Sequence, residues 1–307
     1  MSPSPAPAAL PAPSAPPGTA AGGRRRTARN WIPYLLLLPS VVFLVVFFIA
    51  PLFQGLRQAF TSESGQWGLD TVRQLFHDPG FASALVNTLI MLALILPVQL
   101  VLAMVMSLLV NAKMRGSGCW LYIYMLPLGL SDLTSGIIWY SIFTQQGWLN
   151  SFLEDLGLIH QPVIWLSYQN QLLLIGTIVI AEAWRSTSIV VIVLVGGLQA
   201  IPKEYGEAAE VFHASPWQKF WHVTLPLLRP TLRTALILRT VLAFEVFATV
   251  IALAGSGLQV LATKANDAYT QFQEPHLAAA YGVLIMVLSL IATALFLALL
   301  PTRGQEA

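Results

Sequence analysis

The chain has 307 residues, of which 56% are hydrophobic and only 10% are charged, and its mean hydropathy is +0.69. Soluble domains carry about 25% charged residues, so this composition excludes an ordinary water-soluble protein and indicates a lipid environment. The net charge of +2 is small, and we expect no nucleic-acid partner. The single cysteine, Cys119, excludes an internal disulfide and a cysteine-based metal cluster.

The N-terminal segment, residues 1–29, is rich in Pro and Ala and has a basic end. Residues 1–22 contain no aromatic residue and cannot bury enough apolar surface to offset the entropy of ordering, so we predict disorder. Four arginines precede the first apolar run directly; they are Arg24, Arg25, Arg26 and Arg29. This arrangement predicts that the N-terminus lies in the cytoplasm.

Six apolar runs are long enough, or nearly so, to cross a membrane as helices, which takes about 20 residues. They are residues 31–53, 81–110, 119–143, 171–198, 231–254 and 278–300. The fold class expected is therefore all-α: a polytopic membrane protein with six transmembrane helices. The transmembrane domain would occupy residues 30–303, followed by a short tail at 304–307.

The basic residues gather in alternate loops. They are Lys113 and Arg115 after the second run, Lys203, Lys219 and Arg229 after the fourth, and Arg303 in the tail. The other loops hold fewer bases, so the bias places both termini in the cytoplasm. We expect a multi-pass protein of the cytoplasmic (inner) membrane of a prokaryote, with the loop between spans four and five inside the cell.

Motifs for catalysis are absent from the sequence. It has no G-x-x-x-x-G-K-[ST] loop for phosphates, no H-E-x-x-H zinc motif and no G-x-S-x-G nucleophile elbow. We therefore expect no catalytic residue, no metal site and no cofactor bound by this chain. Uphill transport would need another subunit or an ion gradient to supply the energy.

The segment 207–226 between spans four and five is too polar for a membrane span and too apolar for a solvated linker. Its pattern predicts two short helices. Ser215 has the features of an N-cap, Pro216 suits the first helical position, and Gln218 is the capping-box partner three residues after Ser215. From these residues alone, a helix lying on the lipid surface is the alternative to a docking element.

Glu207, Ala208 and Ala209, followed by Leu225 and Pro226, resemble the E-A-A loop of binding-protein-dependent ABC importers. In that family the loop forms a coupling helix that sits in a cleft of the ATPase subunit. The resemblance implies that Glu207 anchors the loop and that the two alanines permit close packing. His213 stands where the family usually has Gly, at a turn that needs positive φ. The aromatic residues implied to fill the cleft are Trp217, Phe220 and Trp221.

Within this family the chain looks most like carbohydrate permeases of the maltose or trehalose type. The resemblance covers residues 31–302, and its marks are the segments 146–153, 162–166, 183–185 and 197–202. Ser188 and Ala248 depart from the pattern. The resemblance implies four kinds of partner: a second permease of different sequence, an ABC ATPase dimer that uses ATP and Mg, an extracytoplasmic solute-binding protein, and membrane lipid.

Ionisable residues at bilayer depth are costly and usually face a cavity or a partner. Five are expected there: Asp132, Glu182, Arg185, Arg239 and Glu245. Glu182 and Arg185 are three residues apart on one helix and can pair, so an internal ion pair that locks spans four and five, with Arg239 as a further partner, is one interpretation. The other interpretation is that some of them line the substrate pathway.

Span three offers a mixed face for a sugar. Asp132, Ser135, Trp139 and Tyr140 recur at helical spacing, and sugars need both hydrogen bonds and flat apolar contacts. An aromatic belt at the membrane interface is the alternative reading of Trp139 and Tyr140.

The resulting hypothesis is the permease subunit of an ATP-driven importer for a di- or oligosaccharide. An ABC permease for another polar solute, such as glycerol phosphate, is an alternative. An ion-gradient-driven transporter that uses Asp132 and Glu182 as cation sites is another, and an intramembrane enzyme ranks last.

Overall fold

The computed structural model describes residues 31–62, 65–112 and 116–299. In these ranges the regular structure is helical, apart from an isolated antiparallel bridge between Thr61 and Trp67. The all-α prediction is confirmed. The predictions made for residues 1–29, for Lys113 and Arg115, and for residues 300–307 lie outside the described residues.

The chain divides into two compact units, Met1–Pro51 and Leu52–Ala307. In the described part of the first unit, helix α1 (Ile32–Leu44) continues into a π-helical segment, η1 (Val45–Ile49). The side chains of residues 33–50 are all exposed and almost all apolar. Exposed apolar side chains along a helix of this length are what a lipid-facing span requires.

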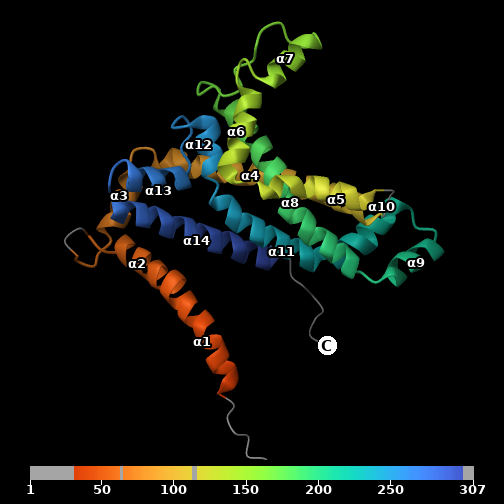
Figure 1. Cartoon of the computed structure of the whole chain (residues 1–307), viewed down its shortest axis with the longest axis horizontal. Coiled ribbons are helices and arrows are strands. Elements are labelled where there is room, and N and C mark those ends of the chain that lie inside the picture. Colours follow the sequence, from red (N-terminus) through yellow and green to blue (C-terminus); the bar gives the residue numbers. More distant parts are fainter. Residues whose placement is uncertain (1–30, 63–64, 113–115, 300–307) are drawn as a thin grey trace, which may run out of the picture. The chain divides into compact units, whose positions relative to one another are not determined.

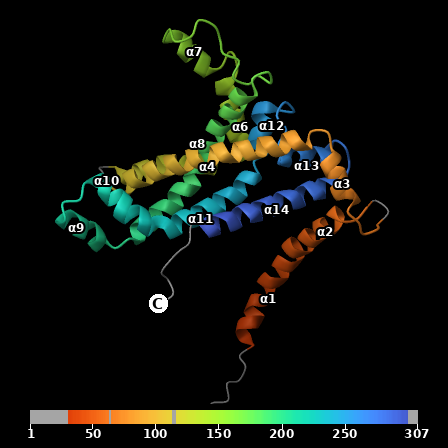
Figure 2. The ribbon, with the colours of Figure 1, turned by 180° about the vertical axis from the view of Figure 1, so that it is seen from behind.

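The second unit begins within α2 (Ala50–Ala59) and contains the remaining helices. These are α3 (Asp70–His77), α4 (Phe81–Asn111), α5 (Ser117–Met125), η2 (Leu126–Gly129), α6 (Asp132–Phe143), α7 (Trp148–Asp155), α8 (Gln171–Ala200), α9 (Lys203–Val211), α10 (Pro216–Lys219), η3 (Phe220–Thr224), α11 (Leu225–Phe244), α12 (Ala248–Ala254), α13 (Leu261–Thr270) and α14 (Pro275–Leu299). Helix α11 packs against α4, α8 and α14, and α4 packs extensively on α8. In Figures 1 and 2, α9 and α10 lie at one end of this packed group, and α3 and α13 lie at the other.

The core of the second unit is built around α8. Leu174, Val191 and Leu194 of this helix have no exposed surface. They belong to two buried clusters, one shared mainly with α4 and α12 and the other mainly with α4 and α11. Close contact also fixes α8 against α11 at Gly197, where a Cβ atom would lie 2.4 Å from Thr231. Helix α8 is thus the rigid element from which the neighbouring site residues are presented.

Four helical stretches are long and apolar enough to cross a membrane: Pro33–Ala59, Phe81–Asn111, Gln171–Ala200 and Pro275–Leu299. Two further pairs of helices are long and apolar enough to cross a membrane only if each bent pair is taken as one span. Gly118–Gly129 with Asp132–Asp155 is bent by 100°, and Pro216–Phe244 with Ala248–Ala254 is bent by 51°. The described residues therefore provide four to six crossings of a polytopic membrane protein.

The third and fifth predicted spans differ from continuous helices, and local chemistry explains the first break. Ser131 has an extended backbone, and its hydroxyl accepts a hydrogen bond from the Thr134 N–H at 3.1 Å. This is an N-cap, so a new helix starts at Asp132. Pro127 lies in the tight turn η2 just before it. In the fifth span, residues 245–247 separate α11 from α12.

Candidate functional site

The segment between α8 and α11 folds as two short helices, α9 and α10, and α10 continues through η3 into α11. The predicted capping box is present. The Ser215 hydroxyl accepts from the Gln218 N–H at 3.3 Å, and the Gln218 Oε1 atom accepts from the Ser215 N–H at 2.8 Å. Pro216 is the first helical residue, as predicted.

His213 makes the turn between the two helices, at a φ of 56°. Its N–H donates to the Glu210 carbonyl at 2.9 Å, and the Ala214 N–H donates to the Ala209 carbonyl at 3.0 Å. These two bonds form a Schellman motif, which usually has Gly at the left-handed position. A non-glycine residue in the left-handed conformation costs about 1 kcal/mol. The two hydrogen bonds offset this cost and stabilise the turn.

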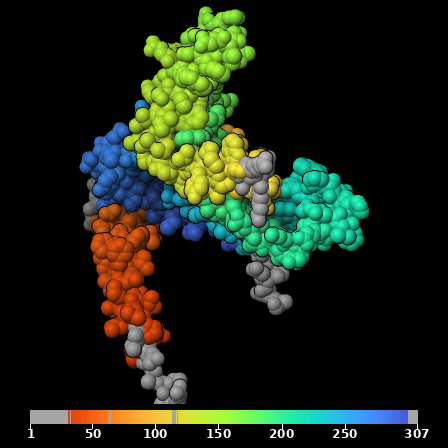
Figure 3. All heavy atoms as spheres, turned by 45° about the vertical axis from the view of Figure 1, so that its right-hand side comes forward, coloured from red at the N-terminus to blue at the C-terminus, as the bar shows by residue number. Residues whose placement is uncertain are grey.

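The surface of this segment is unusually apolar. Phe212 is 85% exposed, Trp217 is 69% exposed and Trp221 is 47% exposed. The rings of Trp217 and Trp221 meet edge to face at 5.6 Å, and Phe220 packs against both. Figure 3 shows the segment in teal, projecting from the neighbouring helices. Exposed apolar patches of this kind mark a surface that another molecule covers.

The motif residue Glu207 on α9 lines a cavity together with Lys219 and Val223. Glu207 and Ala208 are exposed, and Ala209 is half-buried. Among the described residues, no side-chain hydrogen bond or ion pair involves the Glu207 carboxylate, and the anchoring role that the resemblance implies stays a prediction. Leu225 and Pro226 begin α11 and are half-buried.

A second polar cluster lies inside the helix packing and centres on Glu182, whose residue exposure is 1%. One of its oxygens, Oε1, is 2.8 Å from Arg239 Nη2 and accepts from the Ser186 hydroxyl at 2.6 Å. The other oxygen accepts from the Thr249 hydroxyl at 3.2 Å. Gln99 completes the cluster: its Oε1 accepts from Arg239 Nε, and its Nε2 donates to the Glu182 carbonyl. The cluster joins α4, α8, α11 and α12.

Arg185 extends this cluster to α6. Its Nη1 atom is 2.9 Å from Asp132 Oδ1, and its Nη2 atom is 3.4 Å from Glu182 Oε1. The Asp132 side chain is 48% exposed, whereas that of Glu182 is 1% exposed. The structure thus brings together four of the five ionisable residues singled out in the sequence, with the exposed carboxylate at one end.

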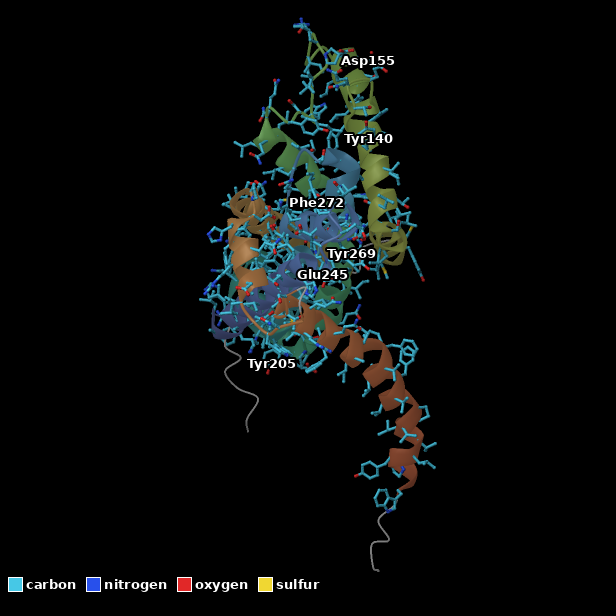
Figure 4. All side chains as sticks on the ribbon, turned by 90° about the vertical axis from the view of Figure 1, so that its left-hand side faces the viewer. Tyr140, Asp155, Tyr205, Glu245, Tyr269 and Phe272 are labelled. Atoms are coloured by element: carbon cyan, nitrogen blue, oxygen red, sulfur yellow. The ribbon has the colours of Figure 1, made fainter. Side chains whose placement is uncertain are left out.

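Glu245, the fifth of these ionisable residues, takes no part in the contacts of this cluster. It is exposed at the break between α11 and α12, and Figure 4 shows it well away from Tyr140 on α6.

The predicted mixed face of span three is partly formed on α6. Ser135 is fully buried, and Trp139 stacks on Phe143 at 5.3 Å and meets Trp184 edge to face at 5.9 Å. Tyr140 is 46% exposed and lies one position further around the helix. The face therefore contains Asp132, Ser135 and Trp139 without Tyr140.

The prediction from sequence missed three side chains of the buried cluster: Gln99, Ser186 and Thr249. Gln99 is the strongest missed signal, because an amide in a run of apolar residues needs a buried partner. Ser186 lies four residues after Glu182 and so shares its helix face. Among the described residues, no group of three or more His, Cys, Asp or Glu side chains could hold a metal ion.

Comparison with known proteins identifies a protein family that matches this chain. The model of the family described as "binding-protein-dependent transport system inner membrane component" matches residues 75–304. The sn-glycerol-3-phosphate transport system permease protein UgpA of Agrobacterium fabrum is 30% identical over 276 residues, covering 86% of this chain and 92% of that protein. The trehalose/maltose transport system permease protein MalF of Thermococcus litoralis is 31% identical over 231 residues, covering 73% of this chain and 77% of that protein.

Solved structures support the fold. One chain of a bacterial ABC transporter involved in the import of the acidic polysaccharide alginate superposes with a TM-score of 0.76 at 23% identity, covering 90% of this chain and 97% of that chain. At this identity the match bears on the fold alone. The family match over residues 75–304 and the 30% identity to UgpA lead to one conclusion: the chain belongs to the family of inner membrane components of binding-protein-dependent transport systems.

Proposed function

We propose that this permease carries a sugar and that residues 203–224 transmit the motion of an ATPase to the transmembrane helices. In this family the permease is a transport subunit, and the ATPase is a separate subunit. The observation that carries the proposal is the exposed aromatic surface of α10 and η3 on a capped, projecting element. Large aromatic residues that enter a pocket commonly dominate docking energy.

The sidedness of this segment follows from α8. This helix has 30 residues and is about 45 Å long, which is enough to cross the membrane. Residues 156–170 precede α8 and α9 follows it, so α7 and α9 belong on opposite sides. The base-rich side is cytoplasmic by the positive-inside rule. We therefore propose that the coupling segment and both termini face the cytoplasm and that α7 faces outward.

The partners proposed for this chain follow from that arrangement. An ATPase dimer, which uses ATP and Mg, would bind the cytoplasmic segment, and a solute-binding protein would deliver cargo on the outer side. A related solved structure is described as a bacterial alginate transporter in complex with an alginate pentasaccharide-bound periplasmic protein. We propose a second permease of different sequence to complete the pathway. No cofactor is proposed for this chain.

The choice of cargo rests on charge and on unpaired polar atoms. The buried cluster holds two acids and two bases, and both Arg185 and Arg239 are already in ion pairs. A phosphate monoester would call for a cation without a carboxylate partner. A sugar needs hydrogen-bonding groups instead, and Ser135 Oγ, Trp139 Nε1 and Arg185 Nε are buried with no partner among the described residues.

These three atoms lie on α6 and α8, beside the half-exposed Asp132. They favour a neutral sugar over glycerol phosphate, the alternative that the relatives' names raise. Uptake of labelled trehalose or maltose, measured in competition with glycerol 3-phosphate, separates the two cargoes.

Glu207→Lys tests the coupling role. Reversing the charge of this exposed residue in the coupling segment is expected to abolish ATP-dependent uptake without affecting membrane insertion. Glu207→Gln keeps the shape of the side chain and is expected to retain part of the uptake. Normal uptake by the Glu207→Lys variant would contradict the proposal. Uptake that survives ATP depletion and collapses with the ion gradient would favour a secondary transporter instead.

A further inference from the structure

The two helices of the coupling segment are tied by a side-chain ion pair. Lys219 Nζ on α10 is 2.7 Å from Glu210 Oε1 on α9. To reach it, the lysine side chain passes over Gly206, where an added Cβ atom would lie 3.0 Å from Nζ and 3.2 Å from Cε. The glycine therefore leaves room for the path that the lysine takes, and the pair joins the two helices across the His213 turn.

Packing contributes little to the relative position of these helices. None of the residues of α9, α10 or η3 is buried. A cavity of about 670 Å³ separates them from the ends of α4 and α8, with Asn111 and Leu198 on one side and Gly206 and Lys219 on the other. Helices that share no core can rotate about the turn that joins them, and the ion pair adds a side-chain contact that limits this rotation.

The ion pair joins helices that are themselves connected to α8 and α11. Helix α10 runs without a break through η3 into α11, which carries Arg239. Helix α9 is joined to α8 through the short link at Ile201 and Pro202. Helices α8 and α11 already pack together at Gly197 and Thr231, so a fixed angle between α9 and α10 makes α9 move with these two helices as one unit.

We propose that Lys219 is a positioning residue, whose ion pair with Glu210 holds α9 and α10 as one rigid body. This inference rests on the proposed coupling role of the segment. With the pair in place, α9 follows the displacement of the aromatic surface by the ATPase and passes it to α8, in addition to the direct route through η3 to α11. Without it, part of the displacement is absorbed at the His213 turn.

The test measures the sugar molecules transported per ATP hydrolysed by the complete transporter in proteoliposomes. Glu210→Gln and Lys219→Met are each expected to lower this ratio by roughly two- to fivefold, the equilibrium weight of an exposed ion pair. The charge-swapped variant E210K/K219E is expected to restore it. Asp70→Asn, which breaks an exposed ion pair with Arg73 outside the coupling segment, is the control and should match the unmodified protein. An unchanged ratio in the two single variants, or a swapped variant as defective as they are, would overturn the proposal.

A second measurement reads the geometry directly. Spin labels at Tyr205 and His222, in a Cys119→Ser background, report the distance between α9 and η3 in the assembled transporter. We expect a narrow distribution that broadens in Lys219→Met and narrows again in E210K/K219E. An equally narrow distribution in Lys219→Met would refute the tie. The distance between the spin labels does not depend on transport, so it tests the role of the ion pair separately. The coupling role of the segment is tested by Glu207→Lys.

Discussion

Replacing Arg239 by Met tests whether the buried cluster stabilises the helix packing. The substitution removes the 2.8 Å contact with Glu182 and leaves that carboxylate in a site with only 1% exposure. Removing one partner of a buried pair costs about 3–5 kcal/mol. Glu182 still accepts from Ser186 and Thr249 and keeps the 3.4 Å contact with Arg185. We therefore expect the lower end of that range, about 3 kcal/mol.

The assay is unfolding of the purified chain in mixed detergent micelles, followed by tryptophan fluorescence. The neutral double variant E182Q/R239M removes both charges and should lose much less than the sum of its single variants, because a buried pair replaced as a unit is often close to neutral. Asp132→Asn provides the contrast, since this carboxylate is 48% exposed and its pair should contribute about 1 kcal/mol or less. A loss below about 1 kcal/mol in Arg239→Met, or simple additivity in the double variant, would refute the reasoning.

Two further predictions concern the opposite end of the second unit and the loop after α7. Lys264→Met leaves the Asp78 carboxylate with the Tyr281 hydroxyl as its one remaining side-chain partner of two, and should cost about 3 kcal/mol in the same unfolding assay. The double variant D78N/K264M should recover most of this loss, and an equal loss in both variants would contradict the prediction. Asn150→Ala removes bonds to Val163 and Trp165 from a side chain that is buried. Limited proteolysis at residues 156–170 should accelerate by roughly tenfold, and an unchanged rate would refute this role.

The parts of the site that the sequence predicted are those set by neighbouring residues. The capping box at Ser215 and Gln218 needs only a spacing of three residues. The turn at His213 was expected from the resemblance, because the family usually has Gly at this position between the two helices. The common face of Asp132, Ser135 and Trp139 follows from helical periodicity. In each case the interacting groups are close in sequence, so a local pattern carries the information.

The parts that the sequence did not predict depend on packing between distant segments. Gln99 bonds to Arg239 across 140 positions, and no spacing rule links them. Glu182 was expected to pair with Arg185, with Arg239 as a further partner, and the structure shows that its shorter contact is with Arg239. The tie between Lys219 and Glu210 was missed because it crosses a turn whose geometry the sequence leaves open.

The break in span three was also not predicted, for a different reason. Its local signals, Pro127, Gly129 and Ser131, were present in the sequence, but they stood inside a run apolar enough to predict one helix. Hydropathy measures the length of an apolar run and is insensitive to a cap within it. The capped start at Asp132 is what turns α6 away from α5 and presents its carboxylate to Arg185.

Photocrosslinking from position 212 tests the central claim most directly. Phe212 is 85% exposed beside the aromatic surface, so a photoreactive phenylalanine there should form an adduct with whatever protein covers the segment. In native membranes we predict an adduct with an ATPase that carries a G-x-x-x-x-G-K-[ST] phosphate loop, whereas the same probe at Leu158, on the proposed outer side, should give none. Adducts from position 212 that contain no ATPase, in cells where uptake is intact, would contradict the account.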